Sequence, residues 1–168
     1  MKILVLGGTS GIGKLVADHL SAEAVSRSTG HGLPENSEKV VDLSLEYDII
    51  INCIPDESQN GILELLWEKH KELNLSTYFI TVGSMGYRFK SKDHHKSQLQ
   101  DYSEKILFDQ NKLRHTLINP AWCYNAKDSS PIPLVSESQL LDIFKFLIDQ
   151  YKYDTVISII EVKGKNVL

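Results

Sequence analysis

Short runs of apolar, mostly β-branched residues alternate along the chain with longer segments in which apolar residues recur every three or four positions. The first pattern predicts buried strands and the second predicts helices with one apolar face. This alternation predicts an α/β fold: a doubly wound, mostly parallel sheet with helices on both faces, in one compact domain over residues 1–168. Strands are predicted at 2–6, 24–28, 39–43, 48–54, 78–82, 115–119 and 155–162, helices at 12–20, 56–73, 97–113 and 136–150, and long loops at 83–96 and 121–135.

Length, composition and charge narrow the classes of function. The chain has 168 residues and a mass of 19.0 kDa, which suits one domain. With 42% hydrophobic and 24% charged residues, it is expected to be a soluble globular protein and not a disordered one. The 22 acidic and 18 basic residues give a net charge of −4. Because nucleic-acid-binding surfaces are basic, this balance argues against nucleic acid as a partner.

Neither the cysteines nor the first residues suggest export or a metal site. Cys53 and Cys123 lie in apolar segments without the Cys-x-x-Cys spacing of zinc sites, so both are expected to be reduced thiols packed in the core. The apolar run from Ile3 to Leu6 is too short for a signal peptide, and no run approaches the ~18 residues of a membrane span. The expectation is a cytoplasmic protein without membrane contact.

A glycine-rich turn stands between the first predicted strand and the first predicted helix. Glycines at such a turn let backbone amides and the helix N-terminus come close to a phosphate group, because no Cβ is in the way. The sequence therefore predicts a nucleotide-binding turn, with a plain tight turn as the alternative. The turn consists of Gly7, Gly8, Thr9, Ser10, Gly11, Ile12 and Gly13.

Two kinds of nucleotide site fit this turn. The spacing Gly8-x-x-x-x-Gly13-Lys14 meets most of the P-loop pattern of kinases and triphosphatases. That pattern continues with a Ser or Thr that holds magnesium, whereas Leu15 stands at this position. The spacing of Gly7, Gly11 and Gly13 instead fits a dinucleotide-binding turn, which is the favoured interpretation.

The turn resembles that of the short-chain dehydrogenase/reductase superfamily, which has this glycine spacing and often ends in Gly-Ile-Gly. The resemblance implies a Rossmann-type, NAD(P)-binding domain and an oxidoreductase activity. The order of further motifs extends the resemblance over residues 2 to about 162. The chain is shorter than typical members, with less material around the second and third strands and in the substrate region, so it looks most like atypical members of the superfamily.

Later positions near the ends of predicted strands match the family in order, and the resemblance implies roles for them. The acidic residue after the third strand would contact the adenine, and the Asn that ends the fourth strand stands where the family has Asn-Ala-Gly. The cofactor positions implied in this way are Asp42, Leu43, Asn52, Cys53, Ile54 and Pro120, while Asn60-Gly61, Ser84 and Asn119 also fall in family order.

The choice between the two dinucleotides depends on the residue about 20 positions beyond the turn, where an acidic side chain binds the ribose 2′-hydroxyl of NAD and an Arg accommodates the 2′-phosphate of NADP. Arg27 stands at this distance from Gly7, between Ser26 and Ser28 and without a neighbouring carboxylate. Because an Arg side chain offers a two-pronged donor to phosphate, NADP(H) is the preferred cofactor and NAD(H) the alternative. The alternative is that Arg27 is a solvated residue at the edge of a loop and has no role in binding.

As a family, these enzymes use a Ser to orient the substrate carbonyl, a Tyr as acid and base, and a Lys four residues later that lowers the pKa of the Tyr and holds the ribose. The cation matters because an ordinary Tyr, with a pKa near 10, is a poor base at neutral pH. Ser84 resembles the first of these, and Tyr102 and Lys105 are the candidates for the other two, three residues apart on one helix face. Tyr87 and Lys90 form a second pair with the same spacing.

Functions from different classes remain open. The first is NADP(H)-dependent hydride transfer to a small carbonyl or related substrate. The second is a non-catalytic NADP(H)-binding module that senses redox state or supports a partner protein, because the family spacing would require a Tyr at Asp101 or a Lys at Ile106. The third is a structural domain whose turn binds no ligand. Beside a small-molecule substrate, the resemblance implies a homodimer or homotetramer, often formed through helices such as 97–113.

Some other residues invite a functional interpretation. Pocket walls are expected from the aromatic and Met residues of the two long loops. His94 and His95 are expected on a solvated loop face, since no carboxylate cluster completes a metal site with them. The apolar helix at 136–150 is expected to cover one face of the sheet. The expected wall residues are Met85, Tyr87, Trp122 and Tyr124.

Overall fold

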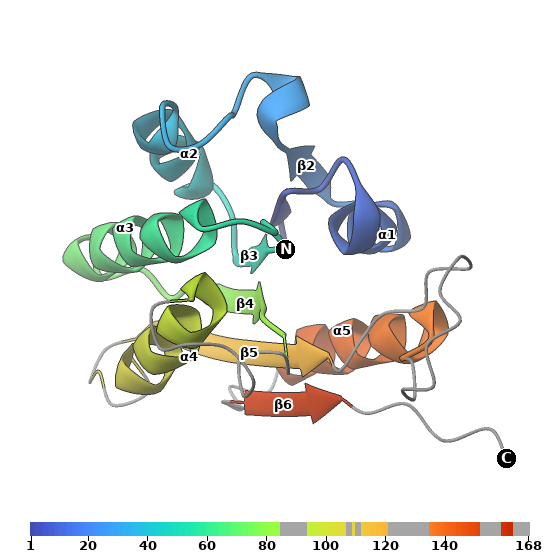
Figure 1. Ribbon diagram of the computed structural model, residues 1–168. Helices are drawn as coiled ribbons and strands as arrows, with labels where there is room; N and C mark the ends of the chain where they lie inside the picture. Colours follow the sequence, from blue (N-terminus) through green and yellow to red (C-terminus); the bar gives the residue numbers. More distant parts are fainter. Residues whose placement is uncertain (85–93, 107–108, 110–111, 121–134, 152–158, 163–168) are drawn as a thin grey trace, which may run out of the picture.

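A computed structural model describes residues 1–84, 94–106, 109, 112–120, 135–151 and 159–162 of the chain. Its strands form one six-stranded sheet in the order β2-β1-β3-β4-β5-β6, and every neighbouring pair is parallel (Figure 1). The strands are β1 (Ile3–Leu6), β2 (Glu23–Val25), β3 (Ile49–Asn52), β4 (Tyr78–Val82), β5 (Arg114–Pro120) and β6 (Ile159–Val162). The helices are α1 (Gly11–Leu20), the 3-10 turn η1 (Arg27–Thr29), α2 (Ser37–Ser44), α3 (Ser58–Glu72), α4 (His95–Ile106) and α5 (Glu137–Tyr151).

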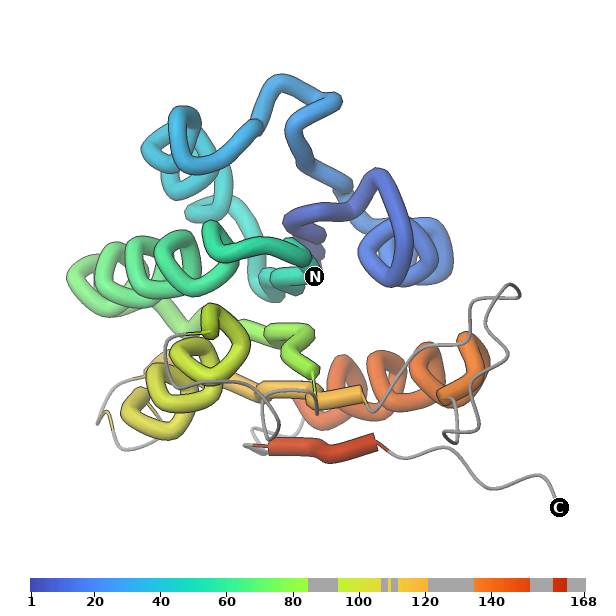
Figure 2. The backbone as a smooth tube through the Cα atoms, viewed as in Figure 1, coloured from blue at the N-terminus to red at the C-terminus, as the bar shows by residue number. Residues whose placement is uncertain are grey.

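Helices cover both faces of the sheet, as predicted. Successive strand residues point to opposite faces, so Leu4 and Ile50 belong to a core with α2, α3 and α4, whereas Val5 and Ile51 belong to a core with α1 and α5. The backbone tube shows the same division, with α1 and α5 together on one side and α2, α3 and α4 on the other (Figure 2). The doubly wound α/β fold is confirmed.

Most predicted elements are confirmed with small changes at their ends. The helix predicted at 97–113 is α4, which begins at His95 and ends at Ile106. The strand predicted at 24–28 is shorter and ends at Val25. Beyond it, Ser26 Oγ accepts a hydrogen bond from the Ser28 N–H, and Thr29 Oγ1 accepts one from the Ser26 N–H, so these side chains cap η1 instead of extending the strand.

The strand predicted at 39–43 is wrong, because this segment lies within helix α2. Val40 and Ser44 are buried four residues apart, which is helical spacing, while the adjacent Val40-Val41 pair suggested a strand. The connection also leaves no room for another strand. A further parallel strand would need two crossovers of about a dozen residues or more each, one from β2 and one to β3, in addition to its own residues. Only Ser26 to Asp48 lie between β2 and β3. One helical crossover fills this segment.

No helix in the described ranges combines the length and the apolar character that crossing a bilayer requires.

Gly61→Ala is expected to stabilise the protein. Gly61 lies inside α3, and a Cβ built on it would have no neighbour within 4 Å. Replacing a helical glycine by Ala removes backbone freedom from the unfolded chain and raises the free energy of unfolding by about 0.5–1 kcal/mol. Urea unfolding of parent and variant measures the difference, and a lower stability of the variant would contradict the described environment of Gly61.

Candidate functional site

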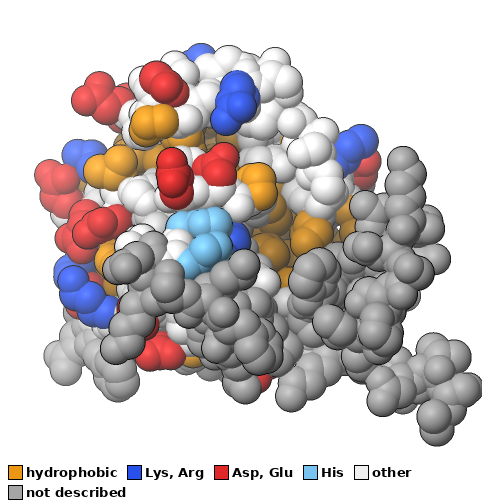
Figure 3. Space-filling view, in the orientation of Figure 1, with side chains coloured by type: hydrophobic (Ala, Val, Ile, Leu, Met, Phe, Trp, Pro, Cys, Tyr) orange, Lys and Arg blue, Asp and Glu red, His pale blue; other side chains and the backbone are white. Residues whose placement is uncertain are grey.

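A cavity of about 730 Å³ opens at the carboxyl ends of β1, β3 and β4. β2 and β3 lie on opposite sides of β1, so the strand order reverses here, and ligands of open α/β sheets bind at such switch points. Figure 3 views the molecule in the orientation of Figure 1, with apolar side chains in the middle of the face and histidine side chains beside them. The cavity is lined by Leu6, Gly7, Thr9, Ser10, Gly11, Ile12, Val25, Ser26, Arg27, Ser28, His31, Leu33, Val40, Cys53, Ile54, Pro55, Asp56, Ser58, Val82, Gly83 and Lys96.

The glycine turn forms one wall because its backbone packs too closely for side chains. Gly7 has a φ of +75°, and a Cβ on it would lie 3.0 Å from the Cys53 carbonyl oxygen. A Cβ on Gly13 would lie 2.2 Å from the Gly7 carbonyl oxygen, so Gly13 lets the first turn of α1 pack against the loop. Gly8 faces β2, where a Cβ would lie 2.7 Å from that of Ala24.

The N-terminus of α1 points its first amides at the cavity wall formed by this turn. Ser10 stands at the N-cap position but makes no side-chain cap hydrogen bond, and the first helical bond runs from the Lys14 N–H to the Ser10 carbonyl at 3.1 Å. The amides before Lys14 therefore remain for a ligand, and they carry the positive end of the helix dipole. This arrangement suits an anionic group such as a phosphate.

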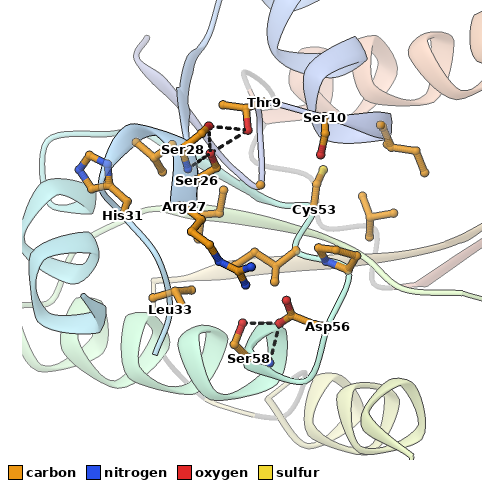
Figure 4. A pocket seen from close by; sticks show the side chains of 18 of the residues that line it. Thr9, Ser10, Ser26, Arg27, Ser28, His31, Leu33, Cys53, Asp56 and Ser58 are labelled. Atoms are coloured by element: carbon orange, nitrogen blue, oxygen red, sulfur yellow. Dashed lines mark hydrogen bonds between the residues drawn. The ribbon is translucent and has the colours of Figure 1, made fainter. Parts of the chain in front are cut away.

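Three hydroxyl groups meet at the edge of the cavity, as Figure 4 shows. Thr9 Oγ1 donates to Ser26 Oγ at 2.7 Å, Ser28 Oγ donates to Thr9 Oγ1 at 3.3 Å, and the Ser26 and Ser28 oxygens are 2.9 Å apart. The Arg27 side chain extends from the same segment toward the middle of the cavity and forms no hydrogen bond or ion pair with the described residues. In Figure 4 the guanidinium lies away from the three hydroxyls, toward Asp56 and Ser58, and both the hydroxyls and the guanidinium are donors suited to an anionic group.

Beyond the three hydroxyls, the wall of the cavity becomes apolar. His31, Leu33 and Val40 reach it from the segment between β2 and α2 and from α2 itself, and Val25 and Ile54 reach it from strand ends. An apolar slot with an imidazole at its border suits a flat ring system such as an adenine.

The opposite end of the cavity is formed by the end of β4 and the start of α4. Val82 and Gly83 line it, and Lys96 enters it from the first turn of α4. Burial lowers the pKa of Lys96 to about 8, although nearby Cys53 and Asp56 act in the opposite direction. Asp56 accepts hydrogen bonds from the Ser58 amide and hydroxyl, which hold its pKa below the usual range, and the charge of Arg27 contributes further.

Most of the predicted cofactor residues do lie together at this cavity. Gly8 and Gly13 do not line it but determine the shape of the turn. Asn52 and Pro120 are buried at strand ends and also do not line it; the Asn52 side chain accepts from the Ile54 amide and donates to the Gln59 carbonyl. The predicted residues among the cavity lining are Gly7, Thr9, Ser10, Gly11, Ile12, Ser26, Arg27, Ser28, Cys53 and Ile54.

The predicted positions of Asp42 and Leu43 beside the cofactor are wrong. Both were expected at the end of a strand, but they lie on α2. Asp42 lines a separate groove between α2 and α3, and Leu43 packs against the core on that side of the sheet. Because no strand ends there, neither residue reaches the main cavity.

The predicted catalytic residues do not come together in the cavity. Tyr102 faces the core on the α3 side, where its hydroxyl is buried without a hydrogen-bond partner among the described residues. Burial and the charges of Glu64, Glu68 and Asp109 raise the pKa of Tyr102, which is the opposite of what a base at neutral pH requires. Lys105 is exposed, with its ammonium 5.9 Å from the Tyr102 ring centre. Ser84 follows Gly83 directly but does not itself line the cavity.

The sequence interpretation missed Lys96. It stands in a basic segment that was assigned to a loop, although the structure places it in the first turn of a helix at the end of the cavity. The family spacing gave no signal for it: if Lys96 were the family lysine, the family tyrosine would stand at position 92. The residue there is Lys92, which lies outside the described residues.

Other sequence expectations have mixed outcomes. Cys53 is a reduced thiol at the cavity wall and is not fully buried. His94 and His95 are half-buried and stacked, with ring centres 4.4 Å apart, at the start of α4. The apolar helix α5 covers one face of the sheet as predicted. Several expected residues lie outside the part of the chain that the structure describes. They are Cys123, the expected pocket-wall residues Met85, Tyr87, Trp122 and Tyr124, and Lys90, which forms the second candidate pair with Tyr87.

No protein-family model and no curated protein matches the sequence. Solved structures do match. A short chain dehydrogenase from Bacillus anthracis superposes with a TM-score of 0.72 at 11% identity, over 99% of this chain and 96% of that chain. A betaketoacyl-[ACP] reductase from Bacteroides thetaiotaomicron gives 0.69 at 19% identity, over 98% and 97%. A short chain dehydrogenase from Leptospira borgpetersenii with bound NAD+ gives 0.70 at 15% identity, over 99% and 92%.

At these identities the likeness concerns the fold. It covers nearly the whole of each chain and includes the parallel sheet with helices on both faces. The chain therefore has the Rossmann-type fold of the short-chain dehydrogenases/reductases, as its glycine turn predicted.

Proposed function

We propose that the protein binds a pyridine dinucleotide in this cavity, NADP(H) in preference to NAD(H), and acts as an oxidoreductase on a small carbonyl or related compound. The observation that carries the proposal is the order of groups along one cavity. Helix amides, three hydroxyls and an apolar slot line one part of it, the Arg27 side chain reaches its middle, and Lys96 enters at the other end. A structural domain without a ligand would not need this arrangement.

The chain's own groups fit the parts of such a cofactor. The turn from Gly7 to Gly13 and the first amides of α1 would bind the diphosphate, because the close packing at Gly7 and Gly13 holds the first turn of α1 against the loop. The slot beside Leu33 and Val40 would take the adenine. Lys96 would bind hydroxyls of the second ribose and can hold or release a proton at Nζ, since its pKa is lowered to about 8. The bound cofactor would supply or accept the hydride.

The preference for NADP(H) rests on the groups near the first ribose. Arg27 and the hydroxyls of Thr9, Ser26 and Ser28 offer donors to a 2′-phosphate. The only carboxylate among the described lining residues is Asp56, which is engaged with Ser58. The carboxylate that would bind the 2′-hydroxyl of NAD is therefore lacking from the Ser26–Ser28 segment.

A second candidate function is a non-catalytic NADP(H)-binding module. It is favoured by one observation: no tyrosine stands four residues before Lys96, and Tyr102 faces the core instead of the cavity. The two candidates differ in turnover. NADPH oxidation with a panel of aldehydes, ketones and quinones, lost in Lys96→Met, supports the oxidoreductase. Tight NADPH binding without any turnover supports the module.

Cofactor binding itself is tested by thermal unfolding with and without saturating NADPH, NADH and ATP. A ligand that binds only the native state stabilises it by about 2.7 kcal/mol at a hundredfold excess over Kd, so NADPH is expected to raise the Tm by several degrees. NADH is expected to raise it less. The absence of a shift with all three nucleotides would overturn the proposal, and a shift with ATP alone would indicate a P-loop type of site.

Arg27→Ala is expected to weaken NADPH binding ~10- to 100-fold, since hydrogen bonds to charged groups contribute about 1.5–3 kcal/mol. NADH affinity is expected to change little, because NADH lacks the 2′-phosphate. Isothermal titration of both cofactors measures the two effects. Lys39→Ala is the matched control, since it removes the same charge from α2 outside the cavity. Equal losses for NADPH and NADH would exclude Arg27 as the residue that distinguishes them.

A further inference from the structure

A buried glutamine lies behind Lys96, and the functions considered so far leave it without a role. Gln59 stands in the first turn of α3 and is 1% exposed. Its side-chain nitrogen donates to the Asn52 carbonyl at 3.1 Å and to the Val82 carbonyl at 2.8 Å. These carbonyls belong to the last residues of β3 and β4, so the amide links the two strand ends below the cavity.

This arrangement fixes which atom of the amide faces Lys96. A glutamine side chain has two N–H donors on its nitrogen and only acceptor capacity on its oxygen. Both donors of Gln59 are used by the strand-end carbonyls, and Oε1 accepts a hydrogen bond from Lys96 Nζ. The flipped amide would place Oε1 against two carbonyl oxygens and its N–H groups against an ammonium, so the network allows only one orientation.

The main chain of Gln59 is held equally firmly. Its amide donates to the Asp56 carbonyl at 3.1 Å, and its carbonyl accepts from the Asn52 side chain at 3.0 Å. The acceptor for Lys96 is therefore anchored to two strands and to the loop after β3. Such an anchored acceptor has little freedom to follow the long Lys side chain, so it determines where the ammonium lies.

Other charged or titratable groups surround Lys96. Cys53 and Asp56 approach it from the loop after β3, and Arg27 lines the same cavity from η1. His95 precedes it on its own helix, and His94 stands directly before that helix. Asp56 is occupied by Ser58, at 3.0 Å from its amide and 2.5 Å from its hydroxyl. In the part of the chain that the structure describes, Gln59 Oε1 thus accepts the hydrogen bond that holds the Lys96 ammonium.

We propose that Gln59 is a positioning residue, whose amide oxygen holds the Lys96 ammonium at the Val82–Gly83 end of the cavity. This inference rests on the proposed function, which assigns the second ribose of the cofactor to that end. Gln59 itself lies beneath the cavity wall and does not line it. Its effect on the cofactor therefore passes through Lys96.

The test uses two substitutions that are expected to shift the titration midpoint of the Lys96 amine in opposite directions. Gln59→Leu removes the acceptor, so the charged amine is less favoured and its titration midpoint falls. Gln59→Glu gives up the two N–H donors to the Asn52 and Val82 carbonyls but places a negative charge against the ammonium, which raises the midpoint by about one pH unit or more. Gln100→Leu is the matched control: Gln100 is also a buried glutamine, 5% exposed, but its side chain accepts from Asn119 at 2.8 Å and donates to Glu104 at 2.6 Å instead of contacting the Lys96 ammonium.

The midpoint is measured on ligand-free protein labelled with carbon-13 lysine, and the Lys96 signal is the one missing from Lys96→Met. The expected result is a fall in Gln59→Leu, a rise in Gln59→Glu and no change in Gln100→Leu. NADPH affinity is expected to fall ~10-fold in both Gln59 variants, since one hydrogen bond to a charged group is lost or redirected in each. General damage to the fold would not move the midpoint in opposite directions.

The inference would be overturned by midpoints of both Gln59 variants that match the Gln100→Leu control, or by midpoints that move together. Shifted midpoints with unchanged NADPH affinity would also overturn it, because the position of the ammonium would then not matter to the cofactor. A parent protein that fails to bind NADPH would sink the proposed function instead, and the titration alone would then decide whether Gln59 holds Lys96.

Discussion

Gly13→Ala is expected to lose NADPH binding by more than ~100-fold and to lower the free energy of unfolding by about 1–3 kcal/mol or more, the usual range for overpacking. The added Cβ would lie 2.2 Å from the Gly7 carbonyl oxygen and 2.8 Å from the Gly7 carbonyl carbon. Both neighbours are backbone atoms, so relief requires the turn to move away from α1. A displaced turn can no longer present its amides to a diphosphate at close range.

Isothermal titration with NADPH and urea unfolding measure the two effects of Gly13→Ala. Gly61→Ala is the matched control, because it makes the same substitution in a helix where the added Cβ meets nothing within 4 Å. The control is expected to bind NADPH like the parent. If Gly13→Ala bound NADPH within about threefold of the parent, the close packing of α1 on the turn would not be what forms the site.

The second large effect is a loss of stability in mild acid, caused by two buried histidines. His70 is 0% exposed, with its ring nitrogens each 2.8 Å from the hydroxyls of Ser44 and Thr77, and burial lowers its pKa to about 4. His115 is 2% exposed, lies 3.1 Å from the Thr81 hydroxyl, and has a pKa lowered by burial to about 3.

Proton uptake by the two histidines determines whether the free energy of unfolding rises or falls with pH. Below the ordinary histidine pKa of 6.5, the unfolded chain binds a proton at each site while the folded protein keeps both rings neutral. The unfolded state therefore gains stability as the pH falls, at about 1.4 kcal/mol per pH unit and histidine. Between pH 7.5 and pH 5 the two sites together are expected to cost about 4 kcal/mol.

Urea unfolding at a series of pH values measures this loss, and His70→Gln is expected to remove about half of it. The variant lowers stability at neutral pH, so the diagnostic quantity is the slope against pH and not the stability itself. His19→Gln controls for the loss of a histidine, because His19 is exposed on α1. A parent protein whose stability is flat between pH 7.5 and pH 5 would contradict the neutral state of the two buried rings.

The fold could be predicted from the sequence where local pattern and burial coincide. The run Ile49-Ile50-Ile51 is fully buried between two cores, and both its β-branched residues and its length suit a strand. The segment around Val40 also contains adjacent β-branched residues, Val40 and Val41, yet it is a helix. What decides there is the number of residues available between β2 and β3, a property of the whole connection that no short window of sequence contains.

For the site as well, features carried by a short stretch of sequence could be predicted, and features that depend on packing between elements could not. The glycine turn could be predicted because consecutive residues carry it, and Arg27 because a fixed distance along the chain carries it. Tyr102 could not be placed from its spacing to Lys105, because packing of α4 against α3 decides which face of α4 is buried. Lys96 and Gln59 meet through two different helices, 37 positions apart, so their contact exists only in the folded protein.

The replacement of a third strand by α2 leaves β2 at the border of the sheet, and this affects how the protein meets other chains. No described strand pairs with the outer side of β2, so its backbone groups there could template the addition of a foreign strand. β2 has only three residues, begins with the exposed Glu23, and is followed at once by the turn η1. A border this short and charged offers an approaching strand few hydrogen bonds, which protects this edge of the sheet from edge-to-edge aggregation.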